Sequence, residues 1–195
     1  MIWKNTCLKK GQKKKVQNKI LLHACCAICS SYPILHLREL GLEPVVYFYN
    51  PNIYPLEEYQ KRLEAQKELC KHHNCELIVE EYNQGEFFEV VKGLENEPER
   101  GKRCDVCFKL RLDKTAQKAH DLGINKFTTS IVISPHKNFS KLTEIGENIA
   151  KKYNLEYFAV DFKKKDGFLK TNKIANSLNL YRQNYCGCKY SIRLL

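Results

Sequence analysis

The chain has 195 residues, of which 43% are apolar, and this is enough to form one well-buried core. It carries 33 basic and 22 acidic residues, a formal net charge of +11, which favours a polyanionic partner such as nucleic acid. The N-terminus lacks the apolar core of a signal peptide, and no stretch approaches the roughly 18 apolar residues of a membrane span. We therefore expect a cytoplasmic protein without a membrane partner.

The pattern of apolar, charged and turn-forming residues divides the chain into a short arm and one larger unit. Residues 1–18, which contain LKKGQKKKVQN, are rich in lysine and lack apolar periodicity, so we expect a flexible basic arm. Residues 19–195 alternate between strand and helix patterns, which predicts a single α/β catalytic domain. The predicted strands are residues 19–23, 44–50, 76–82, 126–132 and 156–162. The predicted helices are residues 31–40, 56–73, 86–92, 104–122 and 138–153.

This alternation predicts a doubly wound, mostly parallel sheet of about five strands, followed by an irregular C-terminal tail that contains cysteines. In such sheets the functional crevice lies beyond the carboxyl ends of the strands. The segment LLHACCAICS, Leu21 to Ser30, lies at the end of the first predicted strand and contains three cysteines but no glycine. A nucleotide-binding loop at this position would be rich in glycine, so that backbone N–H groups could surround phosphate. The thiols therefore indicate a metal rather than ATP.

Seven of the ten cysteines fall into three groups along the chain. In a reducing compartment such groups are expected to bind metal or to carry out redox chemistry, rather than to form a disulfide framework. The groups are Cys25, Cys26 and Cys29; Cys104 and Cys107; and Cys186 and Cys188.

The second group lies in RCDVCFKLRL, at the start of a predicted helix. Cys104 and Cys107 are three residues apart, so both side chains project from one face of the helix. The helix N-terminus and the adjacent Arg103 are expected to lower the thiol pKa and favour the ligating thiolate. Together with the adjacent Cys25 and Cys26, these residues form a set of four thiolates from two distant segments. We favour an iron-sulfur cluster over a structural zinc site, because structural zinc usually uses two short knuckles rather than adjacent cysteines.

The third group, in YRQNYCGCKYS, has a different spacing. A disulfide between Cys186 and Cys188 would close a very small ring, whose strain would make it easily reduced, as catalytic disulfides are. Gly187 permits backbone angles that a larger residue would resist. A second pair of metal ligands is the alternative interpretation of this spacing.

Six ordered segments of the chain resemble one known family, the QueH family of cobalamin-independent epoxyqueuosine reductases. They are LLHACCAICS, FYNPNIYPLEEYQKR, EPERGKRCDVCFKLRL, TTSIVISPHKN, DFKKKDGF and LYRQNYCGC. The resemblance runs from about Lys19 to Ser191 and leaves the basic arm outside it. One departure is Ile28, where a proline is expected in the first motif of the family.

The resemblance implies a fold, a reaction and a set of site residues. The fold would be that of the adenine-nucleotide alpha-hydrolase-like α/β proteins. The reaction would be the reductive removal of the epoxide oxygen from epoxyqueuosine in the wobble position of tRNA, which leaves queuosine and water. The expected ligands of a 4Fe-4S cluster are Cys25, Cys26, Cys104 and Cys107. The expected redox-active disulfide joins Cys186 and Cys188.

The reaction requires two electrons, two protons and an acid for the departing oxygen. We expect the reduced Cys186 and Cys188 pair to supply electrons and protons, and an unidentified electron donor to reduce it again. Asp105 is a candidate for protonating the oxygen or for holding an additional iron, for which Cys29 is the other candidate ligand; alternatively, Asp105 only complements the helix dipole. The alternative functions are another iron-sulfur tRNA-modifying enzyme and a zinc-stabilised tRNA-binding module.

Overall fold

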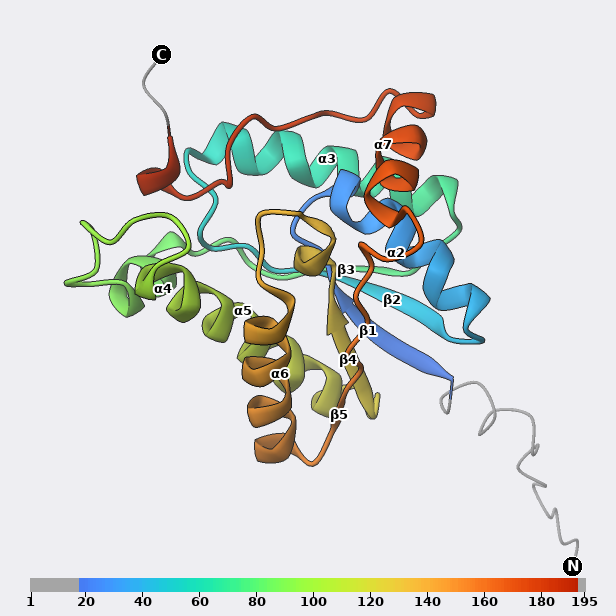
Figure 1. The fold of residues 1–195 in the computed structure, drawn as a ribbon, viewed down its shortest axis with the longest axis horizontal. Coiled ribbons are helices and arrows are strands. Elements are labelled where there is room, and N and C mark those ends of the chain that lie inside the picture. The colour runs from blue at the N-terminus through green and yellow to red at the C-terminus, as the bar shows by residue number, and fades with distance from the viewer. Residues whose placement is uncertain (1–17, 193–195) are drawn as a thin grey trace, which may run out of the picture.

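A parallel five-stranded sheet forms the centre of the protein in a computed structural model that describes residues 18–192. The strand order is β3-β2-β1-β4-β5, and all neighbouring strands are parallel, so the predicted doubly wound α/β fold is confirmed (Figure 1). The strands are β1 (Lys19–His23), β2 (Glu43–Phe48), β3 (Leu77–Val79), β4 (Lys126–Thr129) and β5 (Glu156–Tyr157). The predicted basic arm, apart from Asn18, lies outside the described residues.

Helices cover both faces of the sheet (Figure 1). Helices α2, α3 and α7 lie on one face, and α5 and α6 lie on the other, as right-handed crossovers between parallel strands require. The α-helices are α2 (Ala27–Glu39), α3 (Leu56–His72), α4 (Gln84–Val90), α5 (Lys102–Asp121), α6 (Phe139–Tyr153) and α7 (Gly167–Ser177). Two short 3-10 turns are η1 (Ser130–Ile133) and η2 (Lys189–Ser191). Within residues 18–192, none of these helices combines the length and the apolar character needed to cross a bilayer.

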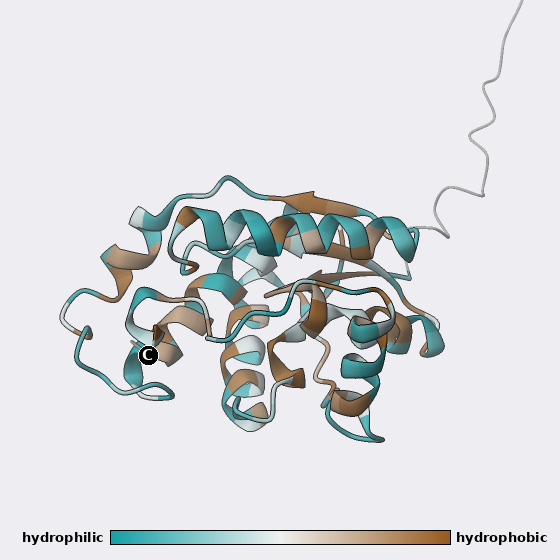
Figure 2. Ribbon diagram, turned by 90° about the horizontal axis from the view of Figure 1, so that it is seen from above, coloured by the Kyte–Doolittle hydropathy of each residue, from teal (hydrophilic) through white to brown (hydrophobic). Residues whose placement is uncertain are grey.

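The central strand β1 is buried on both faces. Ile20, Leu21 and Leu22 have no exposed surface, because β1 pairs with β2 on one side and β4 on the other and helices cover it from above and below. Figure 2 shows hydrophobic residues along the strands and hydrophilic residues on the outer surfaces of the helices. This arrangement places the carboxyl end of β1 next to that of β4, where the strand order reverses.

Four predicted elements differ from the structure by three or more residues at one end, and one of them is β3, which ends at Val79 rather than at residue 82. Helix α2 begins at Ala27 rather than Ser31, because Cys26 caps it: its Sγ accepts a hydrogen bond from the backbone N–H of Cys29 at 3.3 Å. Strand β4 ends at Thr129, whose hydroxyl accepts a hydrogen bond from the backbone N–H of Ile131 and starts the turn η1. Strand β5 has only two residues, so most of the predicted strand 156–162 is irregular.

Helix α7 was not expected, and it packs against α2. Its first residue, Gly167, has no room for a side chain. An added Cβ would be 1.7 Å from the carbonyl oxygen of Phe162, in the preceding loop, and 2.8 Å from the ring of Tyr32 on α2. The preceding residue, Asp166, has a left-handed backbone and makes no capping hydrogen bond. Aspartate is a common N-cap residue, but the side chain of Asp166 does not cap this helix.

Candidate functional site

Three thiols gather at the carboxyl end of β1, in the loop that leads into α2. The Sγ atoms of Cys25, Cys26 and Cys29 all lie within 4.8 Å of one another. Ser130, which follows β4, fixes the loop: its hydroxyl accepts a hydrogen bond from the backbone N–H of Cys25 at 3.2 Å and donates one to the Cys25 sulfur at 3.6 Å. The carboxyl end of the central strand thus presents a cluster of soft sulfur ligands, at the position where nucleotide-binding α/β folds bind phosphate.

The three thiols of the first loop differ in pKa. Hydrogen bonds from Cys26, Cys29 and Ser130 hold the pKa of Cys25 well below its usual range, against the opposing effect of burial. The partner thiols move the other way: hydrogen bonding to Cys25 raises the pKa of Cys26 to about 12 and raises that of Cys29 well above its usual range. Cys25 is therefore the thiolate of the group, and metal binding would have to displace the protons of the other two.

Helix α5 supplies the second pair of thiols. Cys104 and Cys107 lie on its buried face, and the sulfur of Cys104 accepts a hydrogen bond from the backbone N–H of Arg100 at 3.2 Å. The expectation of a lowered pKa is wrong for Cys107, because burial outweighs nearby positive charge and raises the pKa of its thiol to about 11. Arg103 does not pair with either thiol in the described residues; its guanidinium donates to the carbonyls of Leu94, Glu95 and Glu97.

Arg111 brings a buried positive charge to the thiols. It lies one helical turn after Cys107, is 4% exposed, and has no carboxylate partner among residues 18–192. Its hydrogen bonds are long, at 3.4 Å to the carbonyl of Cys107 and 3.5 Å to the side chain of Asn50. Burial acts to lower the pKa of Arg111, but four neighbouring thiols outweigh it and raise the pKa. These are the thiols of Cys107, Cys186, Cys25 and Cys104.

A buried guanidinium without a carboxylate requires negative charge from another source. The thiolate of Cys25 is one such source, and a thiolate-bound metal centre with net negative charge would be another. The donor set and the charge of this region therefore fit an iron-sulfur centre. The first loop and α5 both contribute thiols near the same guanidinium.

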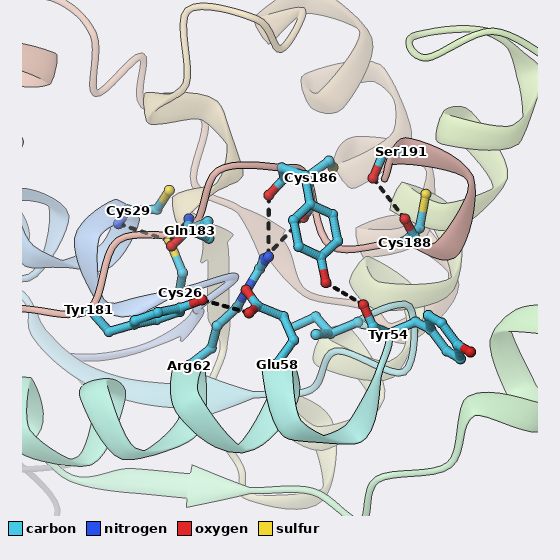
Figure 3. A network of polar contacts seen from close by, with 12 residues as sticks. Cys26, Cys29, Tyr54, Glu58, Arg62, Tyr181, Gln183, Cys186, Cys188 and Ser191 are labelled. Atoms are coloured by element: carbon cyan, nitrogen blue, oxygen red, sulfur yellow. Dashed lines mark hydrogen bonds and ion pairs between the residues drawn. The ribbon is translucent and has the colours of Figure 1, made fainter. Parts of the chain in front are cut away.

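The C-terminal tail crosses this region and is fixed to α3 (Figure 3). Arg62, which is 2% exposed, donates hydrogen bonds to the carbonyls of Tyr185 and Cys186 and forms an ion pair of 2.7 Å with Glu58. Glu58 also accepts a hydrogen bond of 2.6 Å from the hydroxyl of Tyr181. The tail is thereby bound at both ends of the segment that leads to the C-x-C motif.

The tail also contacts the first thiol group directly. The side-chain amide of Gln183 donates a hydrogen bond of 2.9 Å to the sulfur of Cys26 (Figure 3). Tyr54, in the loop before α3, donates its backbone N–H to the carbonyl of Gly187 at 2.8 Å and accepts a hydrogen bond at its own carbonyl from the hydroxyl of Tyr185. Contacts from three distant segments thus determine where the tail thiols lie.

The two thiols of the C-x-C motif have different surroundings, and both are free. Cys186 is partly exposed, and its sulfur lies 3.5 Å from the ammonium nitrogen of Lys137. Cys188 is buried in an apolar cluster with Phe87, Val91 and Cys107. Formation of a disulfide would require the two sulfur atoms to come within bonding distance.

A cavity of about 400 Å³ connects the first thiol group with the tail. Cys25 and Cys29 line it together with Cys186, Arg111 and Lys137. An adjoining cavity of about 470 Å³ shares the wall formed by His136 and Lys137, and Asp105 lines this second cavity. Of the sequence-predicted residues, Cys25, Cys29 and Cys186 line the first cavity and Asp105 lines the second, whereas Cys26, Cys104, Cys107 and Cys188 line neither.

Sequence reasoning left out three residues that matter for the site. Arg111 follows Cys107 at helical spacing, which is a signal that could have identified it. Gln183 and Lys137 carry no such signal, because only the packing of the tail and of the loop after η1 brings them to the thiols. His23 is a buried strand residue, with its ring between the Thr129 hydroxyl and the Tyr49 carbonyl.

Comparison with known proteins assigns the chain to a family. The family model described as "Epoxyqueuosine reductase QueH" matches residues 20–193. The chain belongs to the QueH family. The protein named epoxyqueuosine reductase QueH in Streptococcus pyogenes serotype M1 is 39% identical over 189 residues, covering 94% of this chain and 74% of that protein. The protein of the same name in Thermotoga maritima is 36% identical over 176 residues, covering 89% of this chain and 90% of that protein.

A solved structure resembles the fold of this QueH family member. The U34-tRNA thiolase NcsA from Methanococcus maripaludis, determined with its [4Fe-4S] cluster, superposes with a TM-score of 0.57. The match covers 91% of this chain and 62% of that chain, at 14% sequence identity. At this identity the likeness shows a shared fold. The family resemblance expected from the six sequence segments is therefore confirmed by the sequence comparisons.

Proposed function

We propose that this protein is an epoxyqueuosine reductase, an oxidoreductase that removes the epoxide oxygen from epoxyqueuosine in tRNA and leaves queuosine and water. The observation that carries the proposal is the cavity that joins the thiols of the first loop to Cys186 of the tail, in a chain of the QueH family. The activity requires sulfur-based redox groups beside a space for the modified base, and the cavity supplies both. The excess of 11 positive charges favours binding of tRNA.

The proposed cofactor is a 4Fe-4S cluster held by Cys25, Cys26, Cys104 and Cys107. All four residues offer soft sulfur ligands, and the buried charge of Arg111 would compensate the negative charge of such a centre. When bound, the cluster would supply single-electron transfer. Among the protein groups near it, Gln183 donates to the Cys26 sulfur and Arg100 donates to the Cys104 sulfur, and hydrogen bonds of this kind tune the potential of a cluster.

The proposed role of Cys186 and Cys188 is to store the two electrons that the reaction needs. Oxidation of the two thiols to one disulfide releases two electrons and two protons, which matches the requirement for converting an epoxide into an alkene and water. The position of Cys186 in the cavity wall supports this role. An electron donor of unidentified nature would then reduce the disulfide.

Two further residues, Cys29 and Asp105, belong to the proposal. Cys29 lies with Cys25 and Cys26 and is available as a ligand for an additional iron. Asp105 is the proposed acid or the proposed carboxylate ligand of the additional iron. It lines the adjoining cavity, which shares Lys137 with the first cavity. The proposed cellular location is the cytoplasm, where tRNA is modified.

The test is a direct assay on protein purified without oxygen. Such protein is expected to be brown, to contain iron and sulfide, and to convert epoxyqueuosine in tRNA to queuosine when it is supplied with a dithiol reductant. The nucleosides released from the tRNA would be separated and identified by mass spectrometry. Colourless protein that contains zinc and leaves the epoxide unchanged would instead support a zinc-stabilised tRNA-binding module.

A further inference from the structure

Lys137 brings an ammonium group to the thiol cavity. Its side chain is only 10% exposed, although lysine is rarely buried without a reason. The Nζ atom donates hydrogen bonds to the sulfur of Cys186 at 3.5 Å and to Glu99 Oε1 at 3.1 Å. Lys137 follows β4 and η1, so it lies beyond the carboxyl ends of the central strands, where this fold class places its ligands.

The proposed reaction needs an acid at this place. When a C–O bond of the epoxide breaks, the oxygen becomes strongly basic and must take up a proton before it can leave as water. Asp105 lines only the adjoining cavity, whereas Lys137 lines both cavities and contacts Cys186. Of these two acids, Lys137 is therefore the one that shares a space with the redox thiol and with Cys25.

We propose that Lys137 is a catalytic residue that carries a proton from the Cys186 thiol to the departing epoxide oxygen. This inference rests on the proposed function. Both C–O bonds break, a carbon–carbon double bond forms, and the oxygen leaves as water with two protons. The thiols of Cys186 and Cys188 lose two electrons and two protons and form one disulfide. Lys137 gives one proton to the oxygen and regains the one that Cys186 releases, so it is unchanged after the reaction.

The surroundings of Lys137 keep it in the form that this role requires. Burial acts to lower the pKa of the ammonium group, but the interactions with Cys186 and Glu99 outweigh burial and raise the pKa. The group is therefore a protonated donor at neutral pH. Lys163 holds the backbone at this point, because its ammonium donates to the carbonyl of Lys137 at 3.3 Å.

Two substitutions separate proton transfer from charge. Lys137→Ala removes the ammonium and leaves space in the cavity for a small amine. Lys137→Arg keeps a positive charge beside Cys186 but cannot release a proton, because the guanidinium stays charged in proteins. Lys152→Ala is the matched control, since Lys152 is an exposed lysine at the far end of α6 whose side chain, among residues 18–192, pairs with Asp113 and lies over the ring of Tyr153. Each variant would be reduced, mixed with tRNA carrying epoxyqueuosine, and followed through a single turnover.

We expect both Lys137 variants to slow the single turnover by about 10²- to 10⁴-fold, the usual effect of losing a general acid. Iron content, thermal midpoint and tRNA affinity should match the wild type. Added methylammonium should restore part of the rate in Lys137→Ala but not in Lys137→Arg. Lys152→Ala should react like the wild type.

Three results would overturn the inference: a wild-type rate in Lys137→Ala, a wild-type rate in Lys137→Arg, or a slow Lys137→Ala variant that no small amine rescues. The first would remove any role for the residue, the second would leave only its charge, and the third would make it a structural residue. Absence of turnover by the wild-type protein would instead count against the proposed function itself. The two failures are therefore distinguishable.

Discussion

The Nη1 atom of Arg62 donates a hydrogen bond of 3.1 Å to the carbonyl oxygen of Cys186, although the two residues are 124 positions apart in the chain. The same guanidinium bonds the carbonyl of Tyr185 at 3.2 Å and the carboxylate of Glu58 at 2.7 Å. One buried side chain of α3 therefore fixes the backbone of the C-x-C motif. The planar group with several donors is suited to this, because it binds a carboxylate and two carbonyls together.

Arg62→Lys should loosen the tail while keeping the charge. A single ammonium group cannot reproduce the three contacts, so a buried carbonyl would lose its donor at a cost of about 1–3 kcal/mol in the free energy of unfolding. Hydrogen exchange measured by mass spectrometry should show faster exchange in residues 181–191, and the rate of turnover should fall. Lys67→Arg, a substitution at an exposed position of α3, is the control. Wild-type exchange in the tail of Arg62→Lys would contradict this account.

Gly187→Ala should also disturb the tail, for a steric reason. Gly187 has a φ of 122°, and an added Cβ would lie 2.9 Å from Arg62 Nη1 and 3.2 Å from Ile53 Cγ1. Gly93→Ala is the matched control, because Gly93 also has a positive φ, of 82°, but nothing lies within 4 Å of its added Cβ. We expect Gly187→Ala to lower the thermal midpoint more than Gly93→Ala does and to lower the rate of turnover. Equal effects of the two substitutions would show that the contact with Arg62 is unimportant.

Serine substitutions can distinguish the proposed cluster ligands from Cys29, which lies beside two of them. Cys104→Ser and Cys107→Ser should each lose the visible absorption of the cluster and the activity, because a hydroxyl is a poor ligand for cluster iron. Cys29→Ser should keep cluster iron and sulfide at wild-type levels, and any loss of iron should be confined to an additional atom. Cys70→Ser, which changes a buried thiol on α3, is the control. Retention of the full cluster by Cys104→Ser would require another ligand set.

The tail thiols should differ in reactivity but not in iron content. In the reduced holoenzyme Cys186 should react with an alkylating reagent faster than Cys188, because Cys186 lines the cavity whereas Cys188 packs among apolar side chains. Cys186→Ser and Cys188→Ser should both keep their iron and their affinity for tRNA. Both should lose repeated turnover, since one thiol cannot form the disulfide within the motif. Peptide mass spectrometry would follow the alkylation, and loss of iron from either variant would make that residue a ligand.

The sequence by itself determined the sheet and its central strand. Strand β1 has the predicted bounds Lys19–His23, and α3 differs from its prediction by one residue. Both elements could be predicted from the sequence, because a strand buried on both faces has a continuous apolar run, and a long amphipathic helix repeats its pattern over many turns. Strand β5 and helix α7 were predicted poorly, because tertiary packing rather than local pattern defines a two-residue strand and a helix whose N-cap side chain makes no capping hydrogen bond.

The grouping of thiols was also readable from the sequence, because ligands on one loop or one helix turn are neighbours by spacing alone. Which groups share a cavity was decided by the tertiary structure. Spacing favoured Asp105 as the acid because it lies between Cys104 and Cys107, but the packing of the loop after η1 brings Lys137 to Cys186 and leaves Asp105 in the adjoining cavity. Local spacing fixes only the side chains of one element, whereas contacts between segments tens of residues apart depend on how the layers and the tail pack together.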